Sequence, residues 1–338
     1  MKAVVLVGGE GTRLRPLTET TPKPLIPVMD RRFLDHVLDH LARHGVAEAI
    51  LSSPYLEETF LPFRAARRGA APTIEWITET EPLGTGGAIL QAVDHLATDE
   101  PVLALNGDIL TDLDLTAMIA FHRERGASVT ISLTHVEDAR PFGLVPTDAR
   151  GRVEEFREKP VDAIPGDVNA GTYVLDPAVL HGFERGQNSS IERQIFPAVI
   201  TDGRPVYGFL SHGYWMDLGT PETYLQAHFD IFEGRVEGLR YPAPWVQTTA
   251  TVSLRAHLGR WVAVGDGAVV ADDAQIDDSV LHAGARVGAG ARVVGSILGP
   301  DSQVGAGATV SRCVLGEGAR VAAGAVVEDR KIAGPVSR

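Results

Sequence analysis

The C-terminal part of the chain repeats with a period of 17 residues. Three columns of aliphatic residues recur at this spacing, and within one period the aliphatic positions step by six, six and five residues. A unit this short cannot bury an apolar face by itself, so successive units must stack on one another. Steps of this length are typical of a left-handed parallel β-helix, whose triangular coils place one aliphatic side chain on each face. The columns are Val264, Leu281, Leu298 and Leu315; Val270, Val287, Val304 and Val321; and Ile276, Val293, Val310 and Val327.

The repeat predicts a short β-helical domain over residues 251–338. Glycines at tight corners suit such coils, and Gly288, Gly290, Gly305 and Gly307 stand where corners are expected. About five coils fit in this length, so we expect an open end and one face to pack on the rest of the chain or on another subunit. Residues 236–250 include two prolines and are predicted to be the preceding linker.

Residues 1–135 alternate strand and helix patterns. Short apolar runs predict strands, and apolar residues at helical spacing, such as Leu34, Leu38 and Leu41, predict helices. This alternation predicts an α/β domain over residues 1–235, with a Rossmann-like, mixed but mostly parallel sheet covered by helices on both faces. The expected strands are Ala3–Val7, Ala49–Ser52, Thr73–Ile77, Val102–Leu105 and Val129–Leu133, and further helices are expected at Gly87–Leu96 and Leu115–Arg125.

Residues 136–235 are richer in strand patterns. A turn is expected at Asp148–Gly151, and Ser189-Ser190-Ile191-Glu192 has the form of a capping box before a helix. Thr220 and Pro221 supply an N-cap and a first-turn proline, which predict a helix to about Phe232.

A glycine-rich loop follows the first expected strand. Gly8-Gly9-Glu10-Gly11-Thr12-Arg13 brings backbone N–H groups close to an anion, and Arg13 and Lys23 add positive charge. The loop lacks the Gly-Lys-Ser/Thr ending of a P-loop and the third glycine of a dinucleotide-binding motif. Four prolines over residues 16–27 prevent a long helix after it. We therefore expect an extended loop around a nucleoside triphosphate.

Composition excludes several other classes of function. The net charge of −13 disfavours nonspecific binding to nucleic acid. No run of 18 apolar residues is present, so we expect no membrane span, and the first residues lead into the loop without a signal-peptide pattern. The single cysteine, Cys313, excludes a disulfide within the chain and suits a reducing, cytoplasmic location.

Several motifs together resemble the signature of the sugar-1-phosphate nucleotidyltransferases. The loop reads Gly-Gly-Glu-Gly-Thr-Arg-Leu-Arg-Pro-Leu-Thr over residues 8–18 and Pro-Lys-Pro-Leu-Ile-Pro over residues 22–27. The resemblance covers roughly the first 235 residues, a β-helical tail is common in the family, and the guanylyltransferases of mannose 1-phosphate and heptose 1-phosphate are most similar. Further matching motifs lie at residues 84–89, 106–108, 158–160, 169–172 and 217–221.

The resemblance implies in-line attack of a sugar phosphate on the α-phosphorus of a nucleotide, with release of pyrophosphate. It implies that Arg13 faces the pyrophosphate, that Lys23 faces the α-phosphate, and that Asp108 and Asp217 hold Mg²⁺. Mg²⁺ prefers one or two carboxylates together with phosphate oxygens and waters, which agrees with two motif aspartates. The nucleotide-binding residues expected in addition are Leu6, Gly8, Gly9, Gly11, Thr12, Gly84 and Thr85.

The sugar side is expected around Glu158-Lys159. By resemblance, Glu158 accepts hydrogen bonds from sugar hydroxyls and Lys159 contacts the sugar phosphate. An isolated Glu-Lys pair is usually a surface feature, but the Asn-Ala-Gly-Thr motif that begins ten residues after Lys159 favours the functional interpretation. The remaining sugar-phosphate residues implied are Asn106, Gly143, Asn169 and Thr172.

Glu79 bears on the choice of base. It stands five residues before Gly84, where relatives that use uridine or thymidine triphosphate have glutamine. Guanine presents N1–H and N2–H₂ side by side, and one carboxylate can accept both hydrogen bonds. Uracil and thymine offer one donor flanked by carbonyls. We therefore expect GTP, the alternative being that Glu79 and Glu81 are solvated loop charges.

Three alternatives remain open at this point. The same chemistry could use another hexose, heptose or cyclitol phosphate, or another triphosphate. A non-catalytic subunit that binds nucleotide sugars should lack the cations or metal carboxylates, which are present here. A β-helix acyltransferase would use a histidine such as His257 or His282, but no long loop interrupts the coils, so we interpret both as surface corner residues. A homo-oligomer formed through the β-helix is also expected.

Overall fold

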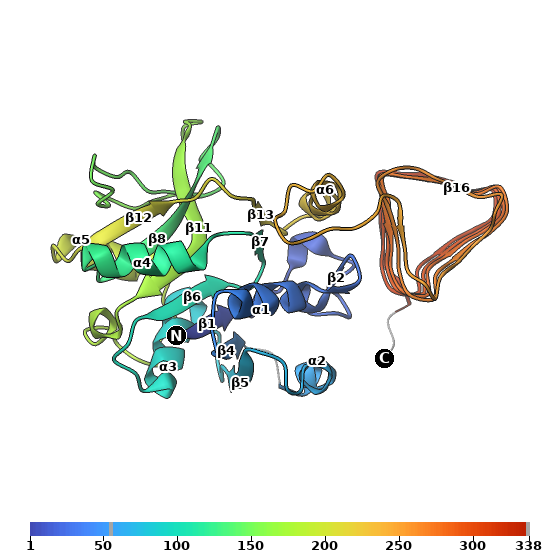
Figure 1. Ribbon diagram of the computed structural model, residues 1–338. Helices are drawn as coiled ribbons and strands as arrows, with labels where there is room; N and C mark the ends of the chain where they lie inside the picture. The colour runs from blue at the N-terminus through green and yellow to red at the C-terminus, as the bar shows by residue number, and fades with distance from the viewer. Residues whose placement is uncertain (54–56, 336–338) are drawn as a thin grey trace. The chain divides into compact units, whose positions relative to one another are not determined.

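The structure is a computed structural model that describes residues 1–53 and 57–335 (Figure 1). The chain divides into two compact units. Unit 1 comprises residues 1–9 and 37–215, and unit 2 comprises residues 10–36 and 216–338. Helix α1 (Phe33–Arg43) and strand β13 (Trp215–Asp217) cross from one unit to the other. Most of the glycine-rich loop therefore belongs to the same unit as the C-terminal repeats, which the sequence did not predict.

Unit 1 is built on a nine-stranded mixed sheet. Its central strands are parallel in the order β6-β1-β4-β5, β11 runs antiparallel to β6 and to β8, and β12 runs parallel to β8. The mostly parallel arrangement predicted for this part is confirmed. The nine strands are β1 (Lys2–Leu6), β4 (Glu48–Ser53), β5 (Thr73–Thr78), β6 (Val102–Asn106), β8 (Val129–Val136), β9 (Gly143–Leu144), β10 (Arg157–Glu158), β11 (Gly166–Leu175) and β12 (Val206–Leu210), and the short strand β7 (Ile109–Thr111) lies outside this sheet.

Helices cover both faces of this sheet. In β8, Val129 and Ile131 join a buried core with α3, whereas Thr130 points to the other face and bonds His122 of α4 at 2.9 Å. Because successive strand residues face opposite sides, α3 and α4 lie on opposite faces. The helices are α2 (Leu61–Ala66), α3 (Gly84–Leu96), α4 (Leu115–Arg125) and α5 (Phe196–Thr201), with short turns η3 (Glu57–Phe60) and η4 (Pro177–Leu180) and the π-helical turn η5 (Ile191–Ile195).

One helix start differs from its prediction. Ser190 is the N-cap of η5, because its side chain accepts the backbone N–H of Arg193. The capping box predicted at residues 189–192 is therefore wrong. Glu192 does not reach back to the backbone but accepts hydrogen bonds from the hydroxyls of Thr85 and Ser190.

Unit 2 contains α6 (Pro221–Phe232) and the β-helix. Three parallel sheets of six, five and five strands form its faces, and their coils trace a triangle in Figure 1. The register places Val270, Val287 and Val304 on neighbouring strands, as the 17-residue period predicted. Strand β14 already pairs with β17 inside the range predicted as linker. The strands are β14 (Trp245–Val246), β15 (Thr251–Val252), β16 (His257–Leu258), β17 (Val262–Val264), β18 (Val269–Val270), β19 (Gln275–Asp277), β20 (Ser279–Leu281), β21 (Arg286–Val287), β22 (Arg292–Val294), β23 (Ile297–Leu298), β24 (Gln303–Val304), β25 (Thr309–Ser311), β26 (Val314–Leu315), β27 (Arg320–Val321), β28 (Val326–Glu328) and β29 (Lys331–Ile332).

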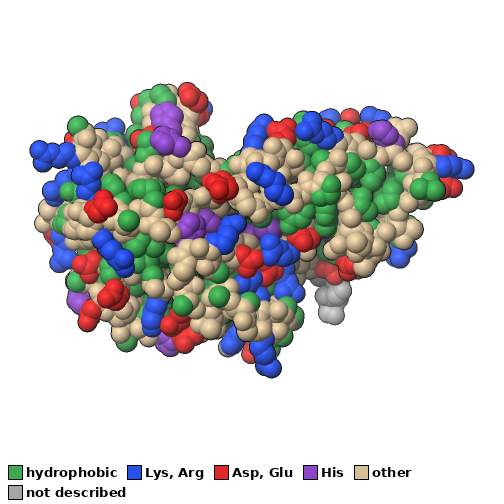
Figure 2. Space-filling model, viewed as in Figure 1, with side chains coloured by type: hydrophobic (Ala, Val, Ile, Leu, Met, Phe, Trp, Pro, Cys, Tyr) green, Lys and Arg blue, Asp and Glu red, His purple; other side chains and the backbone are tan. Residues whose placement is uncertain are grey.

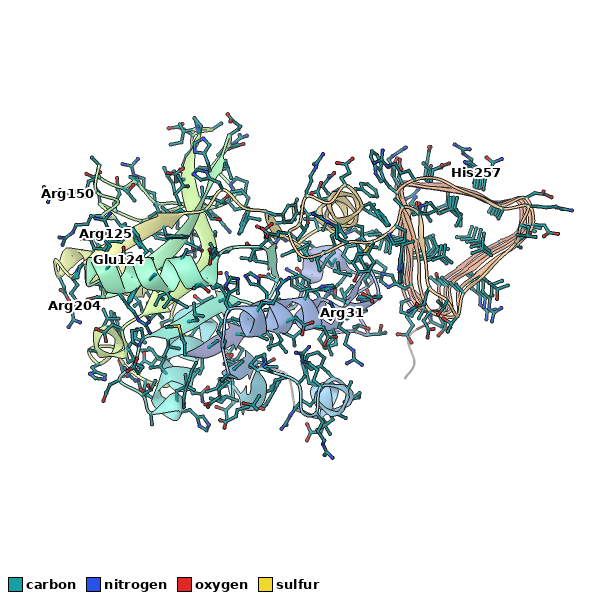
Figure 3. All side chains as sticks on the ribbon, viewed as in Figure 1. Arg31, Glu124, Arg125, Arg150, Arg204 and His257 are labelled. Carbon is teal, nitrogen blue, oxygen red and sulfur yellow. The ribbon has the colours of Figure 1, made fainter. Side chains whose placement is uncertain are left out.

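One corner of the β-helix carries a ladder of small polar side chains. Ser279 Oγ donates to the Asp277 carbonyl and accepts the N–H of Ser296 in the next coil. Ser296 repeats the pattern with Cys313. Each ladder residue thus satisfies two backbone groups that the corner would otherwise leave buried. Figure 3 shows the aliphatic side chains of successive coils stacked in columns inside the triangle.

The distribution of charged side chains on the surface agrees with the net negative charge of the sequence. On the face seen in Figure 2, acidic and basic side chains are interspersed and do not form the continuous basic surface expected of a nucleic-acid-binding protein. Within the described ranges, no helix combines the length and apolar character needed to cross a membrane.

Candidate active site

In unit 2, the two predicted cations lie beside one carboxylate. Arg13 Nη2 is 3.7 Å from Asp217 Oδ2, and Lys23 Nζ is 3.6 Å from Asp217 Oδ1. The Lys23 side chain is 7% exposed, whereas that of Arg13 is 66% exposed. Packing therefore holds the ammonium group in place, and the guanidinium is accessible to a ligand. The arrangement presents two positive charges and one carboxylate to an anion.

The backbone around these side chains requires glycine at two positions. Gly11 has a φ of 60°, and a Cβ there would lie 2.7 Å from Thr18 Cγ2. Thr18 Oγ1 also donates to the Gly11 carbonyl, which folds the loop back on itself. A Cβ at Gly219 would lie only 2.4 Å from Arg13 Nη2. These glycines allow the close approach of backbone and cations that an anion site needs.

The loop itself consists of short turns. Thr12 opens the 3₁₀ turn η1 (Thr12–Leu14), and Lys23 opens η2 (Lys23–Leu25). The segment continues through β2 (Pro27–Val28) and β3 (Arg31–Arg32), which form an antiparallel pair. No long helix follows the glycine-rich loop over the described residues 16–27, as predicted, but the segment forms short 3₁₀ turns and is not the extended chain that was expected.

In unit 1, the motif residues lie at the carboxyl ends of parallel strands. Leu6 of β1 is level with Asn106 of β6, and the Gly107 N–H donates to the Leu6 carbonyl at 2.8 Å. A Cβ at Gly107 would lie 2.7 Å from that oxygen, so glycine keeps the two strand ends together. Asp108 is half-buried directly after this contact, and Gly8 and Gly9 continue from β1. Ligands of parallel sheets bind at this edge.

A bulge in β11 shapes the neighbouring part of unit 1. The register of β11 against β8 shifts between Asn169 and Tyr173, and Gly171 within the bulge has a φ of 73°. Asn169 Oδ1 accepts the Gly171 N–H, and its Nδ2 donates to the Tyr173 hydroxyl. A Cβ at Gly171 would lie 2.8 Å from the Asn106 amide nitrogen. Asn106 and the Asn169 motif are therefore neighbours.

Thr172 continues the same strand. It is 3% exposed, and its N–H donates to Ser132 Oγ at 3.1 Å. Its register partner on β6 is Leu105. In the structure, Thr172 thus helps to hold β11 in the sheet beside the bulge.

Glu158 and Lys159 follow the pairing of β9 with β10. Glu158 is level with Gly143, and a Cβ on that glycine would lie 3.1 Å from Glu158 Oε2. Lys159 has a φ of 50°, and its side chain is exposed. Arg193 Nη2 lies 3.6 Å from Glu158 Oε1. The structure therefore adds a second cation, which the sequence analysis missed, next to the predicted Glu-Lys pair.

Glu79 is buried, with 8% of its surface exposed. Its Oε1 accepts the Ser52 hydroxyl at 3.2 Å, and its Oε2 accepts the Leu83 N–H at 2.9 Å. Glu81, in contrast, is exposed. The alternative of a solvated loop charge is thus wrong for Glu79 and correct for Glu81. Each carboxylate oxygen of Glu79 has a further lone pair for a ligand.

Gly84 and Thr85 begin α3 against the segment around Ser189. A Cβ at Gly84 would lie 2.6 Å from the Ser189 carbonyl oxygen, and Thr85 Oγ1 donates to Glu192 Oε2 at 2.8 Å. Glu192 Oε1 also accepts the Tyr173 hydroxyl at 3.3 Å. Burial, reinforced by the Glu192 charge, raises the pKa of Tyr173 and keeps it a neutral donor. Glu192 thereby connects Thr85 with the Asn169 motif. The sequence analysis did not predict this role, because it interpreted Glu192 as part of a capping box.

Two consecutive segments of the chain match known protein families. Residues 2–234 match the Nucleotidyl transferase family, and residues 241–336 match the GMPPB C-terminal domain. The chain belongs to the nucleotidyl transferase family.

Relatives of this nucleotidyl transferase share most of its length. The mannose-1-phosphate guanylyltransferase of Mycobacterium tuberculosis is 38% identical over 295 residues, which cover 84% of this chain and 80% of the relative. A probable mannose-1-phosphate guanylyltransferase 3 of Oryza sativa is 34% identical over 300 residues, covering 85% and 82%. The crystal structure of HddC from Yersinia pseudotuberculosis is 28% identical with a TM-score of 0.59, covering 67% of this chain and 97% of HddC, and HddC is also known complexed with GMP-PN, at a TM-score of 0.57.

The predicted site residues of the nucleotidyl transferase fall into two groups. Gly11, Thr12, Arg13, Lys23 and Asp217 lie in unit 2, and the other predicted site residues lie in unit 1. Within the described ranges, no cluster of three or more His, Cys, Asp or Glu side chains has the form of a metal site. A Mg²⁺ ion that binds through substrate phosphates and waters needs only one or two carboxylates, and the carboxylates of Asp108 in unit 1 and Asp217 in unit 2 are each of the hard-oxygen type that it prefers.

Proposed function

We propose that this nucleotidyl transferase is a mannose-1-phosphate guanylyltransferase, which converts GTP and mannose 1-phosphate to GDP-mannose and pyrophosphate. The observation that best supports this reaction is the position of Arg13 and Lys23 beside Asp217. Both cations lie on a loop where glycine permits close approach of an anion. The named activity of relatives at 34–38% identity supports the substrates.

In the proposed reaction, an oxygen of mannose 1-phosphate attacks the α-phosphorus of GTP. A new P–O bond forms, the bond from the α-phosphorus to the bridging oxygen breaks, and pyrophosphate leaves with that electron pair. Negative charge grows on the leaving and equatorial oxygens, where cations held in position stabilise the transition state. Arg13 binds the pyrophosphate and Lys23 the α-phosphate. Mg²⁺, held by Asp108 and Asp217, would neutralise charge on the triphosphate when bound.

The remaining residues bind and orient the two substrates. Backbone of Leu6, Gly8, Gly9, Gly11, Thr12, Gly84 and Thr85 surrounds the nucleotide. Lys159, with Arg193 beside Glu158, contacts the sugar phosphate, while Glu158 accepts sugar hydroxyls. Asn106, Gly143, Asn169 and Thr172 shape the sugar pocket. Positioning of this kind supplies much of the acceleration in a reaction that needs no covalent enzyme intermediate.

Glu79 selects guanine in this proposal. Its carboxylate is held by Ser52 and Leu83 and has lone pairs left for the N1–H and N2–H₂ donors of the base. The relative HddC, which binds GMP-PN, supports a guanine nucleotide. Replacing Glu79 by Gln keeps an acceptor for the Leu83 N–H, so the fold should persist. The preference for GTP over UTP in kcat/KM should then fall by about tenfold or more, as expected for one charge-assisted hydrogen bond.

The decisive experiment is a matrix of pyrophosphate release with four nucleoside triphosphates against mannose, glucose and heptose 1-phosphates, all with Mg²⁺. We expect the highest kcat/KM for GTP with mannose 1-phosphate. A preference for a pyrimidine triphosphate would refute the role of Glu79. Binding of GDP-mannose without turnover of any pair would instead identify a regulatory subunit.

We also propose that the protein is a cytoplasmic homo-oligomer that associates through the β-helix. Inward-facing residues of the first coil, such as Val246, Val252 and Leu258, are only partly buried, whereas those of the middle coils are fully buried. Association would cover this end. Light scattering coupled to size-exclusion chromatography tests the proposal, and a monomeric mass at micromolar concentration would contradict it.

The structure gives no support to an acyltransferase function. His257 is exposed on the outer side of the β-helix, as predicted (Figure 3). His282, also predicted to be a surface residue, is 4% exposed and hydrogen-bonded to Tyr224 of α6. The prediction for His282 is wrong because α6 packs over that corner of the β-helix.

A further inference from the structure

The β-helix contacts the cation-bearing loop directly, within unit 2. Lys331, in the last strand β29, donates from Nζ to the backbone carbonyl of Arg13 at 2.7 Å. Nearby, a Cβ at Gly316 would lie 3.0 Å from Pro16 Cβ, so the coil and the loop are in van der Waals contact. The backbone that carries the Arg13 guanidinium is therefore held by a side chain from the opposite end of the chain.

A second contact lies just after Lys23. Three consecutive residues of the loop have a backbone polar group bonded to a buried side chain. The Tyr224 hydroxyl donates to the Pro27 carbonyl, His36 Nε2 bonds the Val28 carbonyl, and the Met29 N–H donates to His228 Nε2. Such a set of bonds leaves the segment little freedom to shift.

The β-helix takes part in this second contact through His282. Its Nε2 lies 2.9 Å from the Tyr224 hydroxyl oxygen. Because Tyr224 has one hydroxyl proton and donates it to Pro27, His282 must supply the N–H of this bond. Burial lowers the pKa of His282 to about 3, so the ring is neutral and has one N–H to donate. The order of the chain of bonds is His282, Tyr224, Pro27.

We propose that the β-helix positions the two active-site cations, with Lys331 and His282 as the positioning residues. Lys331 holds the loop at Arg13, His282 holds it at Pro27 through Tyr224, and Lys23 lies between the two points. An exposed guanidinium contributes to catalysis only if its backbone is held, because small displacements of a transition-state cation cost much of its effect. The proposal rests on the proposed function for its kinetic consequence alone; the contacts themselves can be tested without turnover.

The first test compares Lys331→Met with Arg330→Met in the full chain. Both changes remove one positive charge from adjacent positions, but only Lys331 bonds the Arg13 carbonyl. We expect Lys331→Met to lower kcat on the order of tenfold, as for a misplaced catalytic group, with an unchanged melting temperature. Arg330→Met should resemble the wild type, and Lys331→Arg, which retains a donor, should recover part of the loss. Equal kcat values for Lys331→Met and Arg330→Met would overturn the proposal.

A double-mutant cycle tests whether Lys331 acts through Arg13. In an Arg13→Ala background, Lys331→Met should cause no further loss of kcat, because the group it positions is gone. A full additional loss in that background would show that Lys331 acts by another route and would contradict the proposal.

Amide hydrogen exchange separates the proposal from the assignment of function. Lys331→Met should speed exchange around residues 12–18, and His282→Leu around residues 24–29, with the rest of the chain unchanged. His257→Leu, an exposed histidine on the same β-helix, is the matched control for the second variant. Unchanged exchange in both segments would overturn the proposal even if the enzyme is active. Lack of turnover by the wild type with altered exchange in the variants would refute only the proposed function.

Discussion

At the scale of single residues, Asp217 has a dual position. It is the last residue of strand β13 and lies within 4 Å of two cations, so one carboxylate orients both Arg13 and Lys23. The pair with Lys23 is the more confined, since the Lys23 side chain is only 7% exposed and has few other positions. Gly219, two residues later, leaves the space that the Arg13 guanidinium occupies. The spacing of these residues was readable from the sequence, but their mutual distance was not.

Gly219→Ala should separate activity from stability. The added methyl would lie 2.4 Å from Arg13 Nη2, the far end of a flexible side chain that can move away. We expect kcat to fall on the order of tenfold because the guanidinium is displaced, while the free energy of unfolding changes by less than about 1 kcal/mol. Steady-state kinetics and urea unfolding measure the two quantities. Gly182→Ala, whose methyl meets nothing within 4 Å, is the control, and equal kcat in both variants would contradict the prediction.

At the scale of elements, the 17-residue repeat predicts the β-helix, and the N-cap at Thr220 predicts helix α6. Thr220 and Thr223 form a reciprocal capping box, and the helix runs over Pro221–Phe232 as predicted. In the β-helix, residues 17 apart lie on neighbouring strands from β17 onward because these coils have the same length, whereas the first coil is one residue longer. Local chemistry therefore determines both elements. The exception is the helical turn η5. There Glu192 accepts a hydrogen bond from the Thr85 hydroxyl and does not form the expected capping box.

Cys313 should be replaceable by serine without loss of stability. Serine occupies the equivalent corner of the two preceding coils, where it accepts the N–H of the next coil. We expect Cys313→Ser to change the unfolding free energy by less than about 1 kcal/mol, and Cys313→Val to cost about 1–3 kcal/mol through unsatisfied backbone groups. Denaturant titration checks both values, and a stable valine variant would show that the ladder is dispensable. Burial also raises the pKa of the thiol, so it should react with a thiol reagent only after unfolding.

Acid should destabilise the contact between α6 and the β-helix. Burial lowers the pKa of His228 to about 4 and that of His282 to about 3, against 6.5 for the unfolded chain. Below pH 6.5 the unfolded state therefore binds protons that the folded state does not, so stability falls as the pH is lowered towards 4. At pH 5, each histidine should cost about 2 kcal/mol relative to pH 7.

Thermal unfolding between pH 5 and pH 7 measures this effect. The fall in melting temperature should be smaller for His282→Gln, which keeps a donor for Tyr224 but has no proton to gain. His257→Gln should keep the slope of the wild type, since His257 is exposed. Identical slopes for all three proteins would show that His282 titrates normally.

At the scale of the whole molecule, the two compact units do not follow the order of the sequence. Residues 10–36 belong with residues 216–338, although residues 37–215 of unit 1 intervene in the sequence. The sequence patterns predicted the sheet, the β-helix, most helices and the motif residues, because these depend on neighbours at most one repeat away. His282 and Glu192 were misjudged and Arg193 was missed, because burial and partners depend on segments far away in the chain.

Local sequence patterns were sufficient to predict the reaction class and the two architectures. A glycine-rich loop with two cations, aspartates at strand ends and a 17-residue aliphatic period are local patterns, and each has few structural solutions. Which groups hold these segments in place depends on tertiary contacts between distant parts of the chain. The bond from Lys331 to Arg13 spans 318 positions, and the burial of Glu79 and His282 comes from the packing of distant segments, for which no local periodicity exists.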